Sequence, residues 1–373
     1  MKPTLPLLTL LLASLHAALP AAEITVGPSG FKTIAEGVAA LKAGDTLTIL
    51  PGEYLESVEV KKLAGTKDAP ITIRAQRAGT VLLRGDVEVA GWELVPERAG
   101  VFAVAFKDAA QGVADPRTMT HYEAAATPVE IGTKPGAFFH DAKASRLLVR
   151  TADARPPGVL MVSITNGNGL ALENCAHIVI EGLAFTGYQH ADTSVLLGSR
   201  TRWGIIAGKC ESITLRRCVV YLNSGGLCFT TATANSVIED CFVFANASRT
   251  IGISNQILGW GAKDCVFRRN RIEGFNSHTG SQDQITFYSN DGHTNLLEGN
   301  IAIRASFMDK GDAKNVRVVG NLTTGPKPGF YQQEDASEPP PTPGLRREGS
   351  RGVEKGNRTP SDPGPSAGRE PRG

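Results

Sequence analysis

The sequence has almost no excess of charge of either sign. Its 39 Lys and Arg residues are balanced by 37 Asp and Glu residues, which leaves a net charge of +2 over 373 residues. This balance excludes the strongly basic surface with which nucleic-acid-binding proteins attract phosphates. Aromatic residues are scarce, at 6%, whereas glycine is frequent, with 41 residues. Such a composition is typical of many short strands joined by tight turns rather than of a helix bundle.

Long apolar runs are also missing, apart from one at the N-terminus. Residues 1–22 read MKPTLPLLTLLLASLHAALPAA, in which Lys2 is followed by an apolar stretch and then by small residues. A membrane span needs about 20 apolar residues, so we interpret residues 1–22 as a secretory signal peptide that is cleaved near Ala21 or Ala22. We therefore expect an exported protein without a membrane span, located in the periplasm or outside the cell.

Signatures of several other chemistries are absent. The sequence has no C-x-x-C pair, no glycine-rich phosphate loop and no Ser-His-Asp signature. These absences argue against a zinc site, a nucleotide site and a hydrolytic triad. Among the six cysteines, Cys218 and Cys241 hold equivalent places in neighbouring repeats, where stacked thiols and a disulfide are both compatible with the spacing. The other four have no evident partner.

The middle of the chain consists of repeats. Six segments align without gaps, and successive segments are 21 to 35 residues apart. In each, a large apolar residue stands three positions before the aligned position, with charged residues or glycine mostly between, which is the alternation of a half-buried strand. The aligned positions are Leu183, Cys218, Cys241, Asn270, Asn300 and Asn321, and the apolar ones are Ile180, Leu215, Ile238, Phe267, Leu297 and Val318.

Two repeat folds place an Asn or Cys column after such a strand. A leucine-rich repeat requires a Leu eight positions before that column, and this Leu is absent. A second apolar strand follows the column instead of a helix. We therefore predict an all-β fold, a right-handed parallel β-helix solenoid in which like side chains stack about 4.8 Å apart.

The N-terminal part fits the same fold. Residues 31–42, FKTIAEGVAALK, have Phe31, Ile34, Val38 and Leu41 at helical spacing, which predicts an amphipathic helix that caps the open end of the solenoid. We place the Ile residues of TLTIL and ITIRA, Ile49 and Ile73, one coil apart.

The run GDTLTILPGEY, followed by PITIRA and the Asn-bearing repeats, resembles the pectate-lyase-like superfamily of right-handed β-helix proteins. It is most similar to the branch that contains alginate lyases and chondroitinases, and the resemblance covers residues 24–89 and 178–323. It implies a polysaccharide as the partner and, first, a lyase that eliminates at uronic acid residues of an acidic glycan. A non-catalytic carbohydrate-binding or surface β-helix protein and a glycoside hydrolase remain the alternatives.

We divide the chain into five parts. After the signal peptide, residues 23–90 form the cap and the first coils, 91–157 a lateral β-rich insertion, 158–325 the β-helix repeats and 326–373 a tail. Within the insertion, FFHD and RLLVR predict a hairpin around AKAS. The last 38 residues hold eight Pro and seven Gly, so we expect the tail to be disordered. We expect the whole protein to be a monomer.

Elimination at a uronic acid needs a base, a positive group that neutralises the carboxylate, and a proton donor for the leaving oxygen. Residue types suited to these roles cluster between positions 276 and 314. FMDKGDAKNVRVVGN resembles the strand of the family that presents a Lys before a turn, which implies that Lys310 is the base. The alternative is a solvated turn lysine. The catalytic candidates are Lys310, Arg304, His293 and Tyr288.

Further polar residues of this region are candidates for binding. Asp283 precedes Asp309 by 26 residues, close to one coil, so we predict that the two stack on neighbouring coils, where they could also act as the paired carboxylates of a hydrolase. With His278, they are our candidates for substrate binding. Asp291 and Asp312 are candidate ligands of Ca²⁺, the one cofactor that we consider, although turn chemistry also explains aspartates in these loops.

Overall fold

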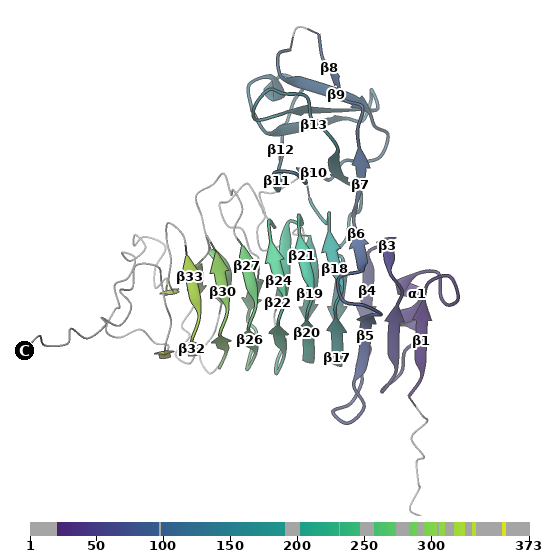
Figure 1. Ribbon diagram of the computed structural model, residues 1–373, viewed down its shortest axis with the longest axis vertical. Helices are drawn as coiled ribbons and strands as arrows, with labels where there is room; N and C mark the ends of the chain where they lie inside the picture. Colours follow the sequence, from purple (N-terminus) through teal and green to yellow (C-terminus); the bar gives the residue numbers. More distant parts are fainter. Residues whose placement is uncertain are drawn as a thin grey trace, which may run out of the picture.

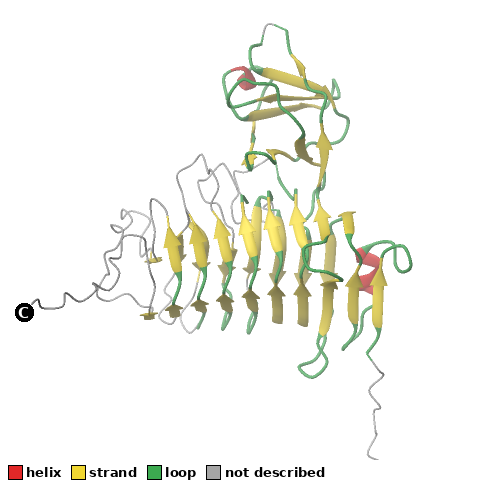
Figure 2. Ribbon diagram, in the orientation of Figure 1, coloured by secondary structure: helices red, strands yellow, loops and turns green. Residues whose placement is uncertain are grey.

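The computed structural model describes residues 21–96, 98–190, 202–230, 232–246, 257–273, 283–288, 294–303, 306–309, 317–324, 330–332 and 353–355. It is almost entirely β-structure, with two short helical segments (Figure 2). Three parallel sheets run along a solenoid, and a separate group of strands projects from one edge (Figure 1). Within the described residues, no helix has the length and apolar character needed to cross a membrane.

From β2 to β34, each coil contributes one strand to each of the three sheets, in the chain order A, B, C. Sheet A contains β1 (Glu23–Val26), β2 (Thr46–Ile49), β5 (Ile71–Ala75), β17 (Ala176–Glu181), β20 (Glu211–Arg216), β23 (Val237–Glu239), β26 (Val266–Arg268), β29 (Leu296–Glu298), β32 (Arg317–Val319) and β35 (Val353–Lys355). Sheet B contains β3 (Gly52–Leu55), β6 (Val81–Arg84), β18 (Ala184–Thr186), β21 (Val219–Tyr221), β24 (Phe242–Phe244), β27 (Arg271–Glu273), β30 (Ile301–Ile303) and β33 (Leu322–Thr324). Sheet C contains β4 (Val58–Lys61), β16 (Leu170–Glu173), β19 (Trp203–Gly208), β22 (Gly225–Thr230), β25 (Ile257–Trp260), β28 (Asp283–Tyr288), β31 (Ser306–Asp309) and β34 (Phe330–Gln332).

The register of sheet A confirms the predicted alignment. The apolar position of each repeat pairs with that of the next, from Ile180 to Val318. These side chains are fully buried in one continuous core. Earlier along the chain the prediction was wrong by two residues, because Ile73 pairs with Leu47, and Ile49 pairs with Ala75.

The aligned Asn residues form a hydrogen-bonded ladder inside the turn between sheets A and B. The Oδ1 atoms of Asn270, Asn300 and Asn321 each accept the backbone N–H of the aligned residue one coil earlier, at 3.0, 3.0 and 2.8 Å. Each Nδ2 donates to a backbone carbonyl of the earlier coil, as Asn270 does to Ile238 at 2.9 Å. The ladder therefore joins adjacent coils through groups that water cannot reach.

Cysteines continue this ladder as free thiols. Cys218 and Cys241 occupy its first polar positions. All six cysteines are buried, and none of them forms a disulfide. The Cys241 thiol lies 3.7 Å from the Leu215 carbonyl, where an Asn amide would donate. Cys175 and Cys210, for which the sequence suggested no partner, stack in a second column, since the Cys175 N–H donates to the Cys210 sulfur at 3.4 Å.

The N-terminal helix α1 (Ile34–Ala39) is shorter than predicted. Thr33 and Glu36 form a capping box, and the Glu56 carboxylate accepts the N–H groups of Ile34 and Ala35 at 3.0 and 3.2 Å. Ile34 and Val38 are buried against the first coils, but Phe31 is 39% exposed. Phe31 precedes the helix and therefore does not share its buried face.

The lateral insertion is a small β-sandwich. One sheet contains β7 (Asp86–Val89), β10 (Gly112–Asp115), β11 (Thr120–His121) and β15 (Leu160–Ser163). The other contains β8 (Glu93–Leu94), β9 (Val101–Ala105), β12 (Glu123–Ala124), β13 (Ala137–Asp141) and β14 (Arg146–Arg150), with a 3₁₀ turn at Glu130–Gly132. The two sheets enclose their own core, and β13 and β14 form the predicted hairpin.

His121 fastens the insertion to the solenoid. This buried side chain donates from Nε2 to the Ala245 carbonyl at 2.7 Å, and its Nδ1 lies 3.2 Å from Oε1 of Gln189. In addition, Ala114 of the insertion packs on Leu222, which follows β21, and on Ala245, which follows β24. The insertion therefore stands at the edge where sheet B leads into sheet C (Figure 1).

Most of the predicted tail lies outside the described residues. Two strands within positions 326–373 are described. β34 pairs with β31 in sheet C, and β35 pairs with β32 in sheet A. Strand pairing thus extends beyond residue 325. Residues 1–20 of the predicted signal peptide, 1–22, also lie outside the described part of the chain.

Candidate functional site

The three outer faces of the solenoid differ in chemistry, and this difference indicates where a ligand can bind. The outer face of sheet A carries a column of alternating charges, one residue per coil. Within this column Arg216 lies 2.5 Å from Glu181, and Arg268 lies 2.7 Å from Glu239. In register order the column contains Arg74, Glu181, Arg216, Glu239, Arg268 and Glu298.

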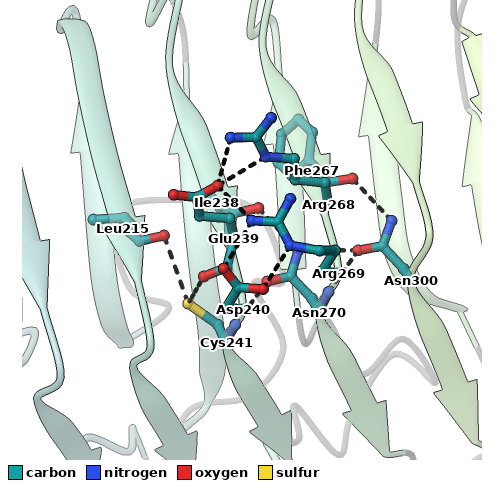
Figure 3. Close-up of polar contacts among 10 residues, drawn as sticks. All are labelled: Leu215, Ile238, Glu239, Asp240, Cys241, Phe267, Arg268, Arg269, Asn270 and Asn300. Atoms are coloured by element: carbon teal, nitrogen blue, oxygen red, sulfur yellow. Dashed lines mark hydrogen bonds and ion pairs between the residues drawn. The ribbon is translucent and has the colours of Figure 1, made fainter. Parts of the chain in front are cut away.

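Residues at the adjoining turn strengthen this charge column. Arg269 lies 2.9 Å from Glu239 and 2.8 Å from Asp240 (Figure 3), and its guanidinium lowers the pKa of the Asp240 carboxyl. Asp240 and Arg269 have φ angles of 54° and 53°, a left-handed conformation that Gly299 adopts one coil later with φ of 61°. Because neighbouring charges in this column are opposite in sign, sheet A presents a neutralised face rather than a receptor for a charged ligand.

The outer face of sheet B carries an aromatic cluster that is already engaged within the protein. The Tyr221 and Phe244 rings stack with centroids 5.2 Å apart and an interplanar angle of 4°. Phe242 stacks on Phe244 at 4.4 Å, and the Arg271 guanidinium lies 5.4 Å from the Phe242 ring centroid. Tyr221 and Phe244 also pack, together with Met119 of the insertion, against the buried cluster of Ala114, Leu222 and Ala245. These rings are therefore engaged with one another and with the protein.

A buried ion pair lies where the insertion leaves sheet B. Arg84, the last residue of β6, lies 3.0 Å from Asp86, and it also contacts Glu53 at 2.5 Å. The Asp86 side chain is fully buried, and a Cβ on residue 187, which is Gly, would lie 2.2 Å from its Cγ. Burial raises the pKa of Asp86, while the Arg84 guanidinium lowers it to a smaller extent. Neither residue was a candidate in the sequence.

This shift predicts how stability changes with pH. The pKa of Asp86 is higher in the folded state than in the unfolded chain, so ionisation of Asp86 costs stability as the pH rises above about 4. Asp86→Asn keeps the shape without the charge. The melting temperature of this variant minus that of the unsubstituted protein should therefore increase from pH 3 to pH 7. A difference in melting temperature that does not change with pH would show that Arg84 fully compensates for the burial.

The outer face of sheet C is bordered by the long connections of the molecule. The insertion joins β6 to β16, and the connections of other coils, such as β18 to β19 and β24 to β25, also lead from sheet B to sheet C. Other connections from sheet B to sheet C are short, such as β3 to β4 and β21 to β22. The β21 to β22 connection contains Asn223, whose N–H donates at 3.0 Å to Oδ1 of Asn246, which follows β24 one coil later, so that the two residues form a second Asn ladder. Variable loops at one edge beside a regular sheet are the usual setting of binding sites on such scaffolds.

On sheet C, residues that pair from one strand to the next form columns along the solenoid. Two of these columns lie on the outer face. The first contains Ile206 and Cys228, which pack with Trp203 into a small apolar cluster. The second contains Lys61 and Glu173, whose side chains are 61% and 48% exposed. It continues through Gly208, Thr230, Trp260 and Tyr288.

The structure places three of the predicted site residues on sheet C. Tyr288 ends β28 and is aligned with Trp260, in the same column as Lys61 and Glu173. Asp309 ends β31 and is aligned with Phe287, in a column that also contains the buried residues Leu172 and Phe229. The register therefore places Tyr288 and Asp309 in adjacent columns of sheet C.

The predicted stacking of Asp283 on Asp309 is wrong. Asp283 is paired with Ser306, three residues before Asp309 in the chain. Since a strand advances about 3.3 Å per residue, the two aspartates are separated along the strands by about 10 Å. The reason is that the local coil is shorter than the 26 residues that separate the two aspartates. In this coil Ile285 pairs with Phe307, 22 residues later in the chain. Lys310, Arg304, His293, His278, Asp291 and Asp312 lie outside the described residues.

The structure also identifies residues that the sequence did not indicate. Trp260 pairs directly with Tyr288 in the exposed column. Its only signal in the sequence was an aromatic residue at the end of an apolar strand, ILGW, whose register could not be assigned across a loop of unknown length. Among the described residues, no group of three or more His, Cys, Asp or Glu side chains is positioned to hold a metal ion.

Comparisons with known families agree with this architecture. Residues 159–333 match the family model described as a right-handed beta helix region, and residues 29–126 match the model of chondroitinase B. Both matches confirm the resemblance that the sequence motifs indicated. A search among curated proteins finds no match.

Several solved structures are similar to this chain. A glycoside hydrolase superposes with a TM-score of 0.51 at 12% identity, over 91% of this chain and 97% of that one. The alginate lyase of Paenibacillus sp. strain FPU-7 gives 0.47 at 12% identity, over 91% and 96%. The pectate lyase Pel9A gives 0.45 at 12% identity, over 83% and 64%. With the family match, the first of these identifies the solenoid as a right-handed parallel β-helix.

Proposed function

We propose that this protein is an exported polysaccharide lyase that cleaves an acidic glycan at uronic acid residues. The observation that carries the proposal is the register of β28 and β31, which aligns Phe287 with Asp309 beside the exposed column of Tyr288. Lys310 is the next residue after Asp309. The match to the chondroitinase B model supports the same reaction class.

The reaction needs three contributions, and the candidate residues have the chemistry to make them. Lys310 in its neutral form takes the proton from the carbon next to the uronic carboxylate. Arg304 pairs with that carboxylate and stabilises the negative charge that develops on it. The carbon–oxygen bond then breaks, a carbon–carbon double bond forms, and Tyr288 or His293 donates a proton to the leaving oxygen. Asp291 and Asp312 are the residues that would hold a Ca²⁺ ion if calcium supplies part of the positive charge.

Hydrolysis is the weaker candidate because the two aspartates that would supply its carboxylates are not aligned on their strands. Glycosidases hold their two carboxyl groups about 5 to 9.5 Å apart, whereas Asp283 and Asp309 are displaced by three residues along paired strands. This displacement does not affect an elimination, which uses a single base.

The product of elimination provides the test. An unsaturated uronic acid absorbs ultraviolet light near 235 nm, so we expect absorbance to rise when the protein is incubated with alginate, pectate or chondroitin. The panel is run with Ca²⁺ and with a chelator. A flat trace on every polymer, from protein shown by circular dichroism to be folded, would reject the lyase. A reducing-sugar assay on the same samples would then identify a hydrolase, and its failure would leave a carbohydrate-binding protein.

A further inference from the structure

The outer face of sheet A carries a second column of side chains beside the charge column. Its members are β-branched or apolar, and each of them is partly buried. In register order it contains Thr72, Val179, Thr214, Val237, Val266 and Leu296. The charged side chains beside it reach solvent, since those of Arg74, Arg216 and Arg268 are 47%, 39% and 37% exposed. The insertion projects from the edge between sheets B and C rather than from sheet A (Figure 1), so the insertion leaves this face open.

We propose that this face of sheet A binds the same face of a second copy of the chain, in an antiparallel homodimer. The two-fold axis lies in the plane of the face, runs parallel to the strands and passes between β20 and β23. Rotation about this axis reverses the direction of the solenoid, so that every charge of the column meets an opposite charge on the other copy. The facing pairs are Arg216 with Glu239, Glu181 with Arg268, and Arg74 with Glu298.

The two neighbouring columns fit the same axis. In the partly buried column, Val237 faces Thr214 of the other copy, and each further member likewise faces a β-branched or apolar residue. At the turn after sheet A, Arg217 and Asp240 hold equivalent places in neighbouring coils, with side chains that are 56% and 41% exposed. The axis sets Arg217 of one copy opposite Asp240 of the other, so three adjacent columns are complementary in one arrangement.

The charges select this arrangement over its alternatives. Moving the axis onto β20, a shift of one coil between the copies, would set Arg216 against itself and Glu181 against Glu239. An axis parallel to the solenoid and centred on the charge column would set each charged residue against its own copy. Like charges that meet across an interface strongly oppose association, so the alternating column fixes both the direction and the register of the second copy.

The affinity comes from the partly buried column, whose apolar surface leaves water when the two faces meet. Exposed ion pairs contribute little to affinity one by one. We therefore expect a reversible dimer with a dissociation constant of about micromolar size. This proposal differs from the monomer that we expect from the sequence.

Analytical ultracentrifugation over about 1 to 200 µM protein measures the dimer. We expect Val237→Arg to raise the dissociation constant about tenfold or more, because Val237 lies next to the axis and the two new charges approach each other. The substitution leaves the ion pairs of the charge column in place, so the variant should keep its melting temperature. Val219→Arg, the same change in a partly buried outer column of sheet B, is the matched control and should dimerise as its parent does. A monomer at every concentration would overturn the proposal, as would a dimer that Val219→Arg disrupts and Val237→Arg does not.

Cross-linking tests the antiparallel direction. Thr72 of one copy faces Leu296 of the other, whereas the two copies of Thr72 lie five coils apart along the solenoid, about 24 Å. A short bismaleimide should therefore join Thr72→Cys protein to Leu296→Cys protein in a mixture, but should not join Thr72→Cys protein to itself. The six native cysteines are buried. Cross-linking of Thr72→Cys protein alone would indicate a parallel dimer and contradict the proposal. Neither measurement uses a glycan, so the result does not depend on the proposed reaction.

Discussion

Replacing Asn270 with Ala should lower the free energy of unfolding by about 3 to 5 kcal/mol, because several buried polar groups would each lose a partner. The Asn270 side chain is 1% exposed. It accepts the N–H of Cys241 at 3.0 Å and donates to the Ile238 carbonyl at 2.9 Å and to Oδ1 of Asn300 at 3.0 Å. Removing it deprives the Cys241 N–H and the Ile238 carbonyl of these buried contacts, while Oδ1 of Asn300 keeps only the backbone N–H of residue 270. Chemical denaturation of both proteins measures the loss.

The same column offers a matched control. In Cys241→Asn, the new amide would lie where the thiol now contacts the carbonyls of Leu215 and Glu239, at 3.7 and 3.3 Å. The substitution extends the ladder instead of interrupting it, so we expect stability equal to or above that of the unsubstituted protein. If Asn270→Ala costs less than about 1 kcal/mol, the backbone ladder holds these turns without the side chains. Hydrogen exchange would show whether the loss is confined to the neighbouring coils, as expected for a solenoid.

The fold was predictable from sheet A because its signal lies within a short stretch of sequence. A large apolar residue such as Phe267 recurs in each repeat, three positions before a column of Leu, Cys and Asn residues, and both positions are inside the coil. No loop intervenes between these two positions. Residues that are equivalent in the aligned repeats are therefore also paired in sheet A. The ladder of Asn223 and Asn246 was missed because it has two members and follows a different strand.

The site could be predicted less well because it depends on sheet C. Each strand of sheet C is reached through a connection of variable length, so residue counting between coils fails there. Asp283 and Asp309 illustrate this, since they are 26 residues apart where the local coil has 22. Arg84 and Asp86 were missed for another reason. Their pairing depends on burial by the insertion, which leaves no periodic signal in the sequence.

Lys310→Ala should abolish the rise in 235 nm absorbance, with a loss of about 10²- to 10⁴-fold in rate, which is what a general base contributes. Lys310 immediately follows β31. The last residue of β31, Asp309, is aligned with Phe287, which precedes Tyr288 in the chain. Lysine side chains are rarely buried in protein interiors. The variant should therefore keep the circular dichroism spectrum and melting temperature of the unsubstituted protein.

Lys310→Arg distinguishes the two ways in which a lysine could act here. Arginine stays protonated at any accessible pH, so it can neutralise a carboxylate but cannot remove a proton. If Lys310 is the base, the Arg variant is as inactive as the Ala variant. If Lys310 only supplies charge, the Arg variant retains activity, and the base must be sought at Tyr288 or His293. Lys61→Ala removes an exposed lysine from the far end of the same sheet and should leave the rate unchanged. A comparable loss in Lys61→Ala would mean that the positive charge of the whole face, rather than one proton acceptor, supports the reaction.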